Sequence, residues 1–500
     1  MGFTEWRFAC LALLGWARFG LAADAPADDE DRNIGAPAIV SVSAAAPGHE
    51  ISRMLTGFNV LFCWQTRDLW ADGRAAQWLK SAGTGLLRYP GGEVTDYFHW
   101  ETPYYPGWKD AWETDPAHRH YFDPAEARKN IGTYLAPEDF IALCREIGAQ
   151  PMLGANLESG LAYGRLDDSI AEAVRWARHA RELGWGVKYW FIGNETYHHG
   201  AHVRATSAEY GEYVRRFGEA LKAADPGIRI VANWQANSFN AGTMAQWRTI
   251  VETAGEFIDV ADVHWYWNWG KVRFSNWLEQ NPIGRRNQWY QGGSFVEEIA
   301  KFREEMKKLG RSDIELAALE WNVGPTEFEP LSAFQCMLIQ AEHLQQFIEG
   351  GLDMACFWPM SFDPARAAET NDFHAREFIY RDEQGRYQPR PALEAFRLYA
   401  PALGTRFVAA KSSIAALPSI AALDEAGGVL RLYAINKSML PRTARFEIEG
   451  FAASKAAARA IVSENPNSNE CQVRPLEAQL ESAAVSIDLP ALSVATIELN

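Results

Sequence analysis

The feature that most constrains the fold is an alternation of short apolar runs with amphipathic helical stretches along most of the chain. The helical stretches, such as PEDFIALCREIG and SAEYGEYVRRFGEALKAADP, begin at polar residues or Pro and end at Gly or Pro. We expect strands over residues 57–61, 85–89, 150–156, 188–193, 228–232, 258–264, 314–320 and 352–358. A series of strand–helix units of this length predicts an α/β fold, a closed (β/α)₈ TIM barrel, over residues 51–400.

A second domain is expected after the barrel. Residues 401–500 lose the helical period and show short alternating segments such as GVLRLYAIN and ARFEIEG, which predict a β-sandwich. The segment AIVSVSAA (38–45) also resembles a strand, and it could complete the sandwich from the N-terminal side. We therefore interpret residues 28–50 as an acidic linker with a possible sandwich strand.

Residues 1–27, MGFTEWRFACLALLGWARFGLAADAPA, are typical of a cleavable export signal. Arg7 precedes an apolar run, and small residues around Ala23 and Ala25 could form the cleavage site. Glu5 and Arg18 make the signal imperfect. We expect a secreted or periplasmic protein with no membrane span, because no other segment holds a long enough apolar run.

Charge and cysteine content narrow the partners. The chain has 64 acidic and 48 basic residues and a net charge of −16, so nucleic acid is not expected as a partner. The 20 Trp cluster in a few segments, which favours stacking on sugar rings, although large proteins also bury Trp. The six Cys show no metal-ligand spacing, and we expect no metal, no other cofactor and no disulfide framework.

Two carboxylates abruptly end apolar strands. KYWFIGNET carries Asn194 and Glu195 after the fourth expected strand, and IELAALEWN carries Glu320 in the seventh. Functional side chains of a TIM barrel gather at the carboxyl ends of its strands, so both glutamates are expected at one mouth. Glycosidic cleavage needs such a pair of carboxyl groups. Helix capping or a salt bridge could explain either glutamate alone, but explains the pair less well.

Four motifs carry a resemblance to a known family: LLRYPGGEVTDYFHWE (86–101), VKYWFIGNET (187–196), DVADVHWYW (259–267) and AALEWNV (317–323). With the ending LPALSVATIEL, they make the chain similar to clan A glycoside hydrolases, most closely the family 51 α-L-arabinofuranosidases. The resemblance covers residues from about 50 to the end. It implies a retaining double displacement, with Glu195 as the general acid/base and Glu320 as the nucleophile.

Further substrate-binding residues follow from these motifs. Arg88 is expected to hold the Glu320 carboxylate ionised, and Asn194 to offer its amide to the sugar 2-hydroxyl. The resemblance implies that His264 and Tyr266 form the family's His-x-Tyr pair, in which the Tyr hydroxyl orients the nucleophile. A satisfied core histidine is the alternative for His264.

Aromatic side chains could add stacking platforms. We expect Trp100 and Trp358 to stack on sugar faces, with ordinary core packing as the alternative. The long segments 96–135, 265–292 and 360–390 are expected to form an aromatic cleft on the catalytic face. Their rings include Tyr97, Phe98, Tyr104, Tyr105, Trp108, Trp112, Trp265, Trp267, Trp269, Trp277 and Trp289.

Two positions depart from the family pattern. Glu93 follows Pro-Gly-Gly where the arabinofuranosidases usually carry Asn, and the first expected strand ends in Asn59 or Val60 where they carry Glu. GNET is also followed by YHHG. Since these positions line the family's sugar subsite, the terminal sugar stays open.

Three functions remain after this reading. The leading one is an arabinofuranosidase-like hydrolase acting on plant or algal oligo- or polysaccharide. The second is an endo-acting β-glycanase of the same clan, such as a xylanase or agarase. The third is a noncatalytic carbohydrate-binding protein, against which the paired Glu195 and Glu320 argue because binding alone needs neither. The residues do not fix the linkage, the mode of attack or the oligomeric state.

Overall fold

A computed structural model describes residues 36–101, 129–198, 204–235, 237–270, 272–285, 292–325, 330–361 and 375–500. Eight parallel strands close into a barrel in chain order, which confirms the predicted TIM barrel. They are β2 (Gly57–Asn59), β3 (Leu86–Tyr89), β4 (Gln150–Ala155), β5 (Tyr189–Ile192), β6 (Arg229–Asn233), β7 (Val260–Trp267), β8 (Glu315–Val323) and β9 (Met354–Phe357).

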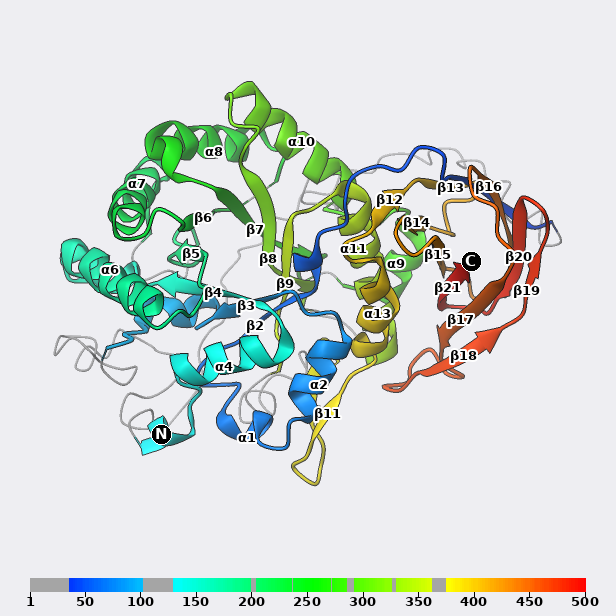
Figure 1. Cartoon of the computed structure of the whole chain (residues 1–500), viewed down its shortest axis with the longest axis horizontal. Helices are drawn as coiled ribbons and strands as arrows, with labels where there is room; N and C mark the ends of the chain where they lie inside the picture. Colours follow the sequence, from blue (N-terminus) through cyan, green and yellow to red (C-terminus); the bar gives the residue numbers. More distant parts are fainter. Residues whose placement is uncertain are drawn as a thin grey trace, which may run out of the picture. The chain divides into compact units, whose positions relative to one another are not determined.

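Helices follow the strands and lie outside the ring (Figure 1). The longer ones are α2 (Arg74–Ser81), α4 (Pro137–Ile147), α6 (Leu166–Glu182), α7 (Ser207–Ala224), α8 (Ala241–Ala254), α10 (Phe295–Lys308), α11 (Ala333–Gly350) and α13 (Ala392–Tyr399). The short helices α1 (Arg67–Trp70), α5 (Glu158–Ala162) and α9 (Phe274–Glu279) lie in the connections between strands and the longer helices. Serine or threonine caps begin several of them. Thr206 and Ser294, for example, accept the backbone N–H of Glu209 and Glu297, three residues into α7 and α10.

The C-terminal region is the predicted β-sandwich. One sheet has the order β13-β1-β16-β20-β19 and the other the order β12-β14-β15-β21-β17-β18. The first sheet contains β1 (Ala38–Ser43), β13 (Ala410–Ser412), β16 (Arg442–Glu449), β19 (Ala478–Leu480) and β20 (Ala484–Leu489). The second contains β12 (Arg406–Val408), β14 (Ser419–Asp424), β15 (Val429–Asn436), β17 (Ala456–Val462), β18 (Gln472–Leu476) and β21 (Ser493–Leu499).

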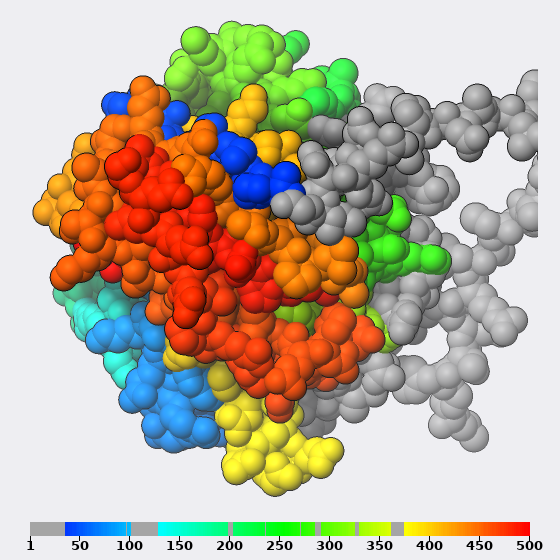
Figure 2. All heavy atoms as spheres, turned by 90° about the vertical axis from the view of Figure 1, so that its right-hand side faces the viewer, coloured from blue at the N-terminus to red at the C-terminus, as the bar shows by residue number. Residues whose placement is uncertain are grey.

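The strand β1 joins the first sheet from the other end of the chain. It pairs in parallel with β16 and antiparallel with β13, and Figure 2 shows this blue segment among the orange strands. A small hairpin, β10 (Ile379–Arg381) and β11 (Tyr387–Pro389), precedes α13. The six β1 residues 38–43 thus belong to the sandwich and not to the linker.

The alternation along β7 determines which side chains reach the barrel mouth. Val260 belongs to the barrel interior, so Asp262, His264 and Tyr266 point inward at every second position. Trp265 and Trp267 point to the surrounding helices and are fully buried. One strand therefore delivers three polar groups to the mouth and two indoles to the outer core.

A β-bulge in β8 changes which of its side chains point into the barrel. Asp262 pairs with Ala317 and His264 with Glu320, so β8 has one more residue than β7 in this interval. Ala317 and Leu319 both face the barrel interior, and strict alternation would turn Glu320 outward. The extra residue lets Glu320 face the mouth, which is a common use of bulges beside functional sites.

Several predicted features lie outside the described residues. They are the export signal 1–27, most of the linker, and the rings of Tyr104, Tyr105, Trp108, Trp112 and Trp289. Export therefore stays a prediction. Among the described helices, none has the length and apolarity that a membrane crossing requires.

Candidate active site

Glu195 lies directly after β5 in a left-handed backbone conformation, with a φ of 48°. This conformation is costly for a residue with a side chain, so it must be held by its surroundings. The Glu195 N–H donates to Asn233 Oδ1 at 2.8 Å. The Glu195 carbonyl accepts the His198 N–H at 2.7 Å, which closes the turn. Two hydrogen bonds thus hold the backbone of Glu195 in this turn.

Glu320 is held from both sides of its carboxylate. Arg88 Nη1 donates to Glu320 Oε1 at 3.2 Å, and the Tyr266 hydroxyl donates to Oε2 at 2.9 Å. The Arg88 side chain is fully buried and the Glu320 side chain is 8% exposed. The structure therefore brings Arg88 and Tyr266 to Glu320, as their positions in the sequence predicted.

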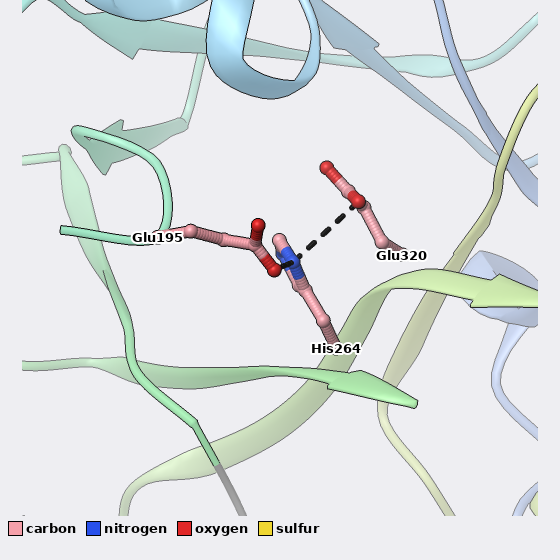
Figure 3. Close-up of side chains that lie close together, drawn as sticks. All are labelled: Glu195, His264 and Glu320. Carbon is pink, nitrogen blue, oxygen red and sulfur yellow. Dashed lines mark hydrogen bonds and ion pairs between the residues drawn. The ribbon is translucent and has the colours of Figure 1, made fainter. Parts of the chain in front are cut away.

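His264 lies between the two glutamates (Figure 3). Its Nδ1 is 2.7 Å from Glu195 Oε1 and 3.5 Å from Glu320 Oε2. Its Nε2 is 3.3 Å from Asp262 Oδ2. The Asn233 amide nitrogen donates to Asp262 at 2.8 Å, which holds that carboxylate behind the imidazole ring. One imidazole is thus in contact with three carboxylates.

These contacts determine where the proton lies in the free protein. Burial by itself lowers the pKa of a histidine, but Glu320, Asp262 and Glu195 outweigh it and raise the pKa of His264 to about 10. The imidazole is therefore protonated at neutral pH. It carries the positive charge that the three carboxylates share.

The two glutamates shift in opposite directions. Burial raises the pKa of Glu195, but the charge and hydrogen bond of His264 outweigh it and lower the pKa to about 2. Burial also raises the pKa of Glu320, and the charges of His264 and Arg88 do not reverse that rise. Burial thus outweighs the Arg88 contact, which was expected to favour the ionised Glu320 carboxylate. The sequence did not show that His264 would lie between the pair.

The same three side chains are the one group among the described residues that offers metal-ligand atoms close together. One donor atom each from Glu195, His264 and Glu320 lies within 4.8 Å of the others. A protonated imidazole cannot bind a metal ion through the same nitrogen. Metal binding here would therefore require His264 to release its Nδ1 proton first.

A buried amide network supports the site from below. Arg88 donates to Asn194 Oδ1 at 2.7 Å and to Asn59 Oδ1 at 2.9 Å. The Asn59 amide nitrogen donates to the carbonyls of Leu319 and Phe357. Because Arg88 occupies the oxygen of Asn194, a hydrogen bond from Asn194 to another group would have to come from its amide nitrogen. Asn59 is fully used in holding the barrel mouth.

Trp358 lies beside Glu320, and Glu93 follows Gly92, which approaches the Trp358 ring closely. A Cβ on Gly92 would be 2.6 Å from the Trp358 ring and 3.5 Å from Glu320 Oε1. Only glycine allows this approach, so the indole covers the Glu320 side of the pocket. Glu93 is half-buried and lies near enough to Asp96 to raise the pKa of that buried carboxyl, whose rise comes first from burial.

The structure does not bring Trp100 into this group. Its ring stacks on Trp176 of α6 at 6.1 Å and 7°, and its N–H donates to the Glu172 carbonyl. These contacts correspond to the packing alternative and correct the sugar-platform prediction, because the loop turns back onto α6. Trp265, Trp267 and Trp277 are likewise fully buried, so the expected aromatic cleft does not include them.

Three site residues were missed by the sequence reasoning: Asn233, Asp262 and Asp96. Asn233 ends β6, and the rule that identified Glu195 and Glu320 would also have identified it. Asp262 precedes His264 by two residues, so strand alternation puts both on one face. Asp96 Oδ1 accepts the Asn194 N–H at 3.3 Å from a 3₁₀ turn, and no pattern in the sequence indicated that contact.

Comparison with known proteins shows what the chain is similar to. No family model matches the chain. An intracellular exo-alpha-(1->5)-L-arabinofuranosidase of Halalkalibacterium halodurans is 25% identical over 254 residues, which are 48% of this chain and 46% of that protein. Alpha-L-arabinofuranosidase C of Emericella nidulans is 25% identical over 205 residues, 38% of each chain. The chain thus aligns with less than half the length of these curated relatives.

Solved structures match nearly the whole fold. The family 51 arabinofuranosidase of Xanthomonas axonopodis pv. citri superposes with a TM-score of 0.70 at 16% identity, covering 93% of this chain and 100% of that one. The family 44 endoglucanase Cel44A of Clostridium thermocellum has a TM-score of 0.62 at 15% identity, covering 93% and 100%. The barrel with a β-sandwich is therefore shared with these glycoside hydrolases. Among them the chain most resembles the family 51 arabinofuranosidases.

Proposed function

We propose that this protein is a retaining glycoside hydrolase of the α-L-arabinofuranosidase type. The observation that carries the proposal is the pair of carboxylates, whose nearest ligand atoms lie within 4.8 Å across the barrel mouth. Retaining glycosidases hold their carboxyl groups about 5–5.5 Å apart, whereas inverting ones need about 6.5–9.5 Å to admit a water molecule.

The contacts support a role for each group in a double displacement. Glu320, oriented by Tyr266 and Arg88, attacks the anomeric carbon. The bond between that carbon and the leaving oxygen breaks at the same time. His264, the hydrogen-bond partner of Glu195 at 2.7 Å, passes its proton to Glu195, which gives it to that oxygen and is left as the carboxylate. In the second step water attacks the glycosyl ester, Glu195 removes a proton from that water, and Glu320 is released as the carboxylate. The proton that Glu195 takes up in the second step returns to His264.

An endo-acting β-glycanase is the second candidate, because of the two departures from the arabinofuranosidase pattern. Asn59, where those enzymes carry Glu, has both ends of its amide engaged by Arg88 and strand carbonyls. It therefore has no free group for a sugar hydroxyl. Glu93 adds a half-buried carboxylate where Asn is usual. A different set of sugar contacts is expected in this subsite.

Product analysis tests the proposal. The purified protein is offered α-1,5-arabinan, xylan, agarose and aryl glycosides, and products are followed by size and by NMR of the first anomer released. We expect net retention, monosaccharide from an arabinofuranoside, and a fluorosugar trapped on Glu320. Inversion, or trapping elsewhere, would contradict the double displacement, and release of long oligosaccharides would favour the endo-acting candidate.

A Glu195→Ala variant tests the acid/base role. Leaving groups that need protonation lose it in this variant, so kcat/KM for natural glycans should fall about 10²–10⁴-fold. Activated aryl glycosides still form the glycosyl-enzyme, which accumulates until azide releases it. An equal loss with both kinds of substrate, and no azide effect, would remove Glu195 from this role.

A further inference from the structure

One indole next to the candidate site is open to solvent. Trp269 follows β7 and is 59% exposed, whereas Trp265, Trp267, Trp277 and Trp321 are fully buried. Exposing so large an apolar ring costs free energy unless it has a partner. The exposed ring is also rigidly attached to the strand that carries His264 and Tyr266.

The backbone around Trp269 is fixed by close contacts. A Cβ on Gly324 would be 2.6 Å from the Trp269 Cα, so only glycine lets the two segments touch. The Gly324 N–H donates to the Trp267 carbonyl, and the Gly270 N–H donates to the Pro325 carbonyl at 2.8 Å. The preceding residue, Asn268, is buried in the left-handed region with a φ of 50°. A loop held this way presents its indole in one direction and spends little entropy on binding.

The ring lies next to the nucleophile's own partner. The Trp269 and Tyr266 rings meet edge to face, with centroids 5.0 Å apart at 84°, and the Tyr266 hydroxyl holds Glu320. Trp358 covers the pocket at the other Glu320 oxygen and is only partly exposed. The Glu195 side chain is 31% exposed against 8% for Glu320, so the site opens on the side of the acid. The leaving group must occupy that open side, because Glu195 has to reach its oxygen.

We propose that Trp269 is the stacking platform for the sugar ring on the leaving-group side of the cleaved bond. The proposal rests on the proposed glycosidase function and adds a specificity-determining residue to it. An indole face recognises the C–H face of a neutral pyranose or furanose ring and gives little to a leaving group without a ring. The substrate class it selects is therefore an oligo- or polysaccharide with a sugar on both sides of the bond.

Kinetics of Trp269→Ala test the platform. The probe is whichever of α-1,5-arabinotriose, β-1,4-xylotriose and cellotriose the wild type cleaves fastest, compared with the matching glycosyl fluoride. We expect kcat/KM for the trisaccharide to fall about 10–100-fold, mostly in KM, and by at least five times more than for the fluoride. Leu183→Ala, which removes an exposed side chain at the end of α6, is the control and should change neither value. Equal losses with both substrates, or no loss with the trisaccharide, would overturn the proposal.

Binding without turnover separates the two proposals. Calorimetry with the same three trisaccharides compares Glu320→Gln with Glu320→Gln/Trp269→Ala. A Kd raised about tenfold or more in the double variant supports the platform even if the wild type cleaves none of the probes, an outcome that would count against the hydrolase alone. An unchanged Kd, or no binding of any trisaccharide to Glu320→Gln, would overturn the platform. Trp269→Phe should give an intermediate Kd, because a smaller aromatic face remains.

Discussion

Two of the buried charge clusters among the described residues are built on opposite principles. At the contact between barrel and sandwich, Lys437 and Glu342 form an ion pair at 2.9 Å, with both side chains fully buried. Every atom of that pair has a fixed partner: Glu342 accepts the Trp277 and Ile283 N–H groups, and Lys437 also donates to the Gln280 carbonyl. One cation thus faces one anion.

The barrel mouth is unbalanced by comparison. There Asp262, Glu195 and Glu320 share the imidazolium of His264, and Arg88 also donates to Glu320. The excess of carboxylates raises the pKa of His264 and makes the proton's position depend on what Glu195 and Glu320 are doing. A balanced pair fixes structure, whereas an unbalanced group can move a proton during a reaction.

The largest expected effect follows from Glu320→Gln. Loss of the nucleophile should lower kcat/KM on the order of 10⁵-fold for every substrate, including aryl glycosides. Stability should not fall, because burial raises the pKa of Glu320 and its ionised form costs free energy in the folded state at neutral pH. Initial rates and thermal melts of the same preparation measure both. A strong loss of Tm together with the loss of activity would show that the Glu320 charge stabilises the fold, as the Lys437–Glu342 pair does.

The second cluster should respond in the opposite way. Lys437→Met leaves Glu342 buried without its cation and should lower the free energy of unfolding by about 3–5 kcal/mol. The folded fraction should keep its kcat, because neither residue contacts the mouth. Urea unfolding and active-site titration measure the two quantities. The matched control is Lys437→Met/Glu342→Gln, which removes the unpaired charge and should regain part of the stability; no recovery would show that packing, and not charge, was lost.

Much of the architecture could be predicted from the sequence because strands and their ends leave local patterns. The eight barrel strands were visible as apolar runs. Glu195, which follows β5, and Glu320, which lies in β8, were visible as polar residues that interrupt such runs. The mouth position of Glu320 was expected from its place in the strand, but the backbone feature that produces it was not visible, since simple alternation from Leu319 turns Glu320 outward. It depends on a bulge, which is a property of pairing with β7 and β9.

Local sequence patterns could not predict which aromatic side chains are buried or which group of the site carries the proton. Trp265 and Trp267 alternate with His264 and Tyr266, so β7 itself indicated that they face the helices, but their place in a long aromatic segment suggested exposure. Trp277 is buried, and its N–H donates to Glu342 of helix α11, which is distant in the sequence. The pKa values of Glu195 and Glu320 depend on where His264 lies between them, which only the closed barrel determines.

The smallest of the three effects concerns pH, and it tests whether the mouth is unbalanced. The pKa of His264 is raised from 6.5 to about 10 in the fold, so its charge stabilises the protein fully below pH 6.5. That contribution is lost as pH rises from 6.5 to about 10. The pKa of Glu195 is lowered from 4.5 to about 2, so its contribution is complete above pH 4.5 and is lost as pH falls toward 2.

His264→Gln removes the imidazolium and should show both limits. Between pH 4.5 and 6.5 its Tm should lie furthest below that of the wild type, and the difference should shrink toward pH 10, where the wild-type imidazole is losing its proton too. Without the imidazolium, Glu195 and Glu320 repel each other, so one of them keeps a proton. That carboxyl loses its proton at a lower pH than the wild-type imidazolium does. The alkaline limb of kcat/KM should therefore move down by at least about two pH units. His264→Gln and wild-type profiles that run parallel, in both Tm and kcat/KM, would show that the proton of the free protein does not lie on His264.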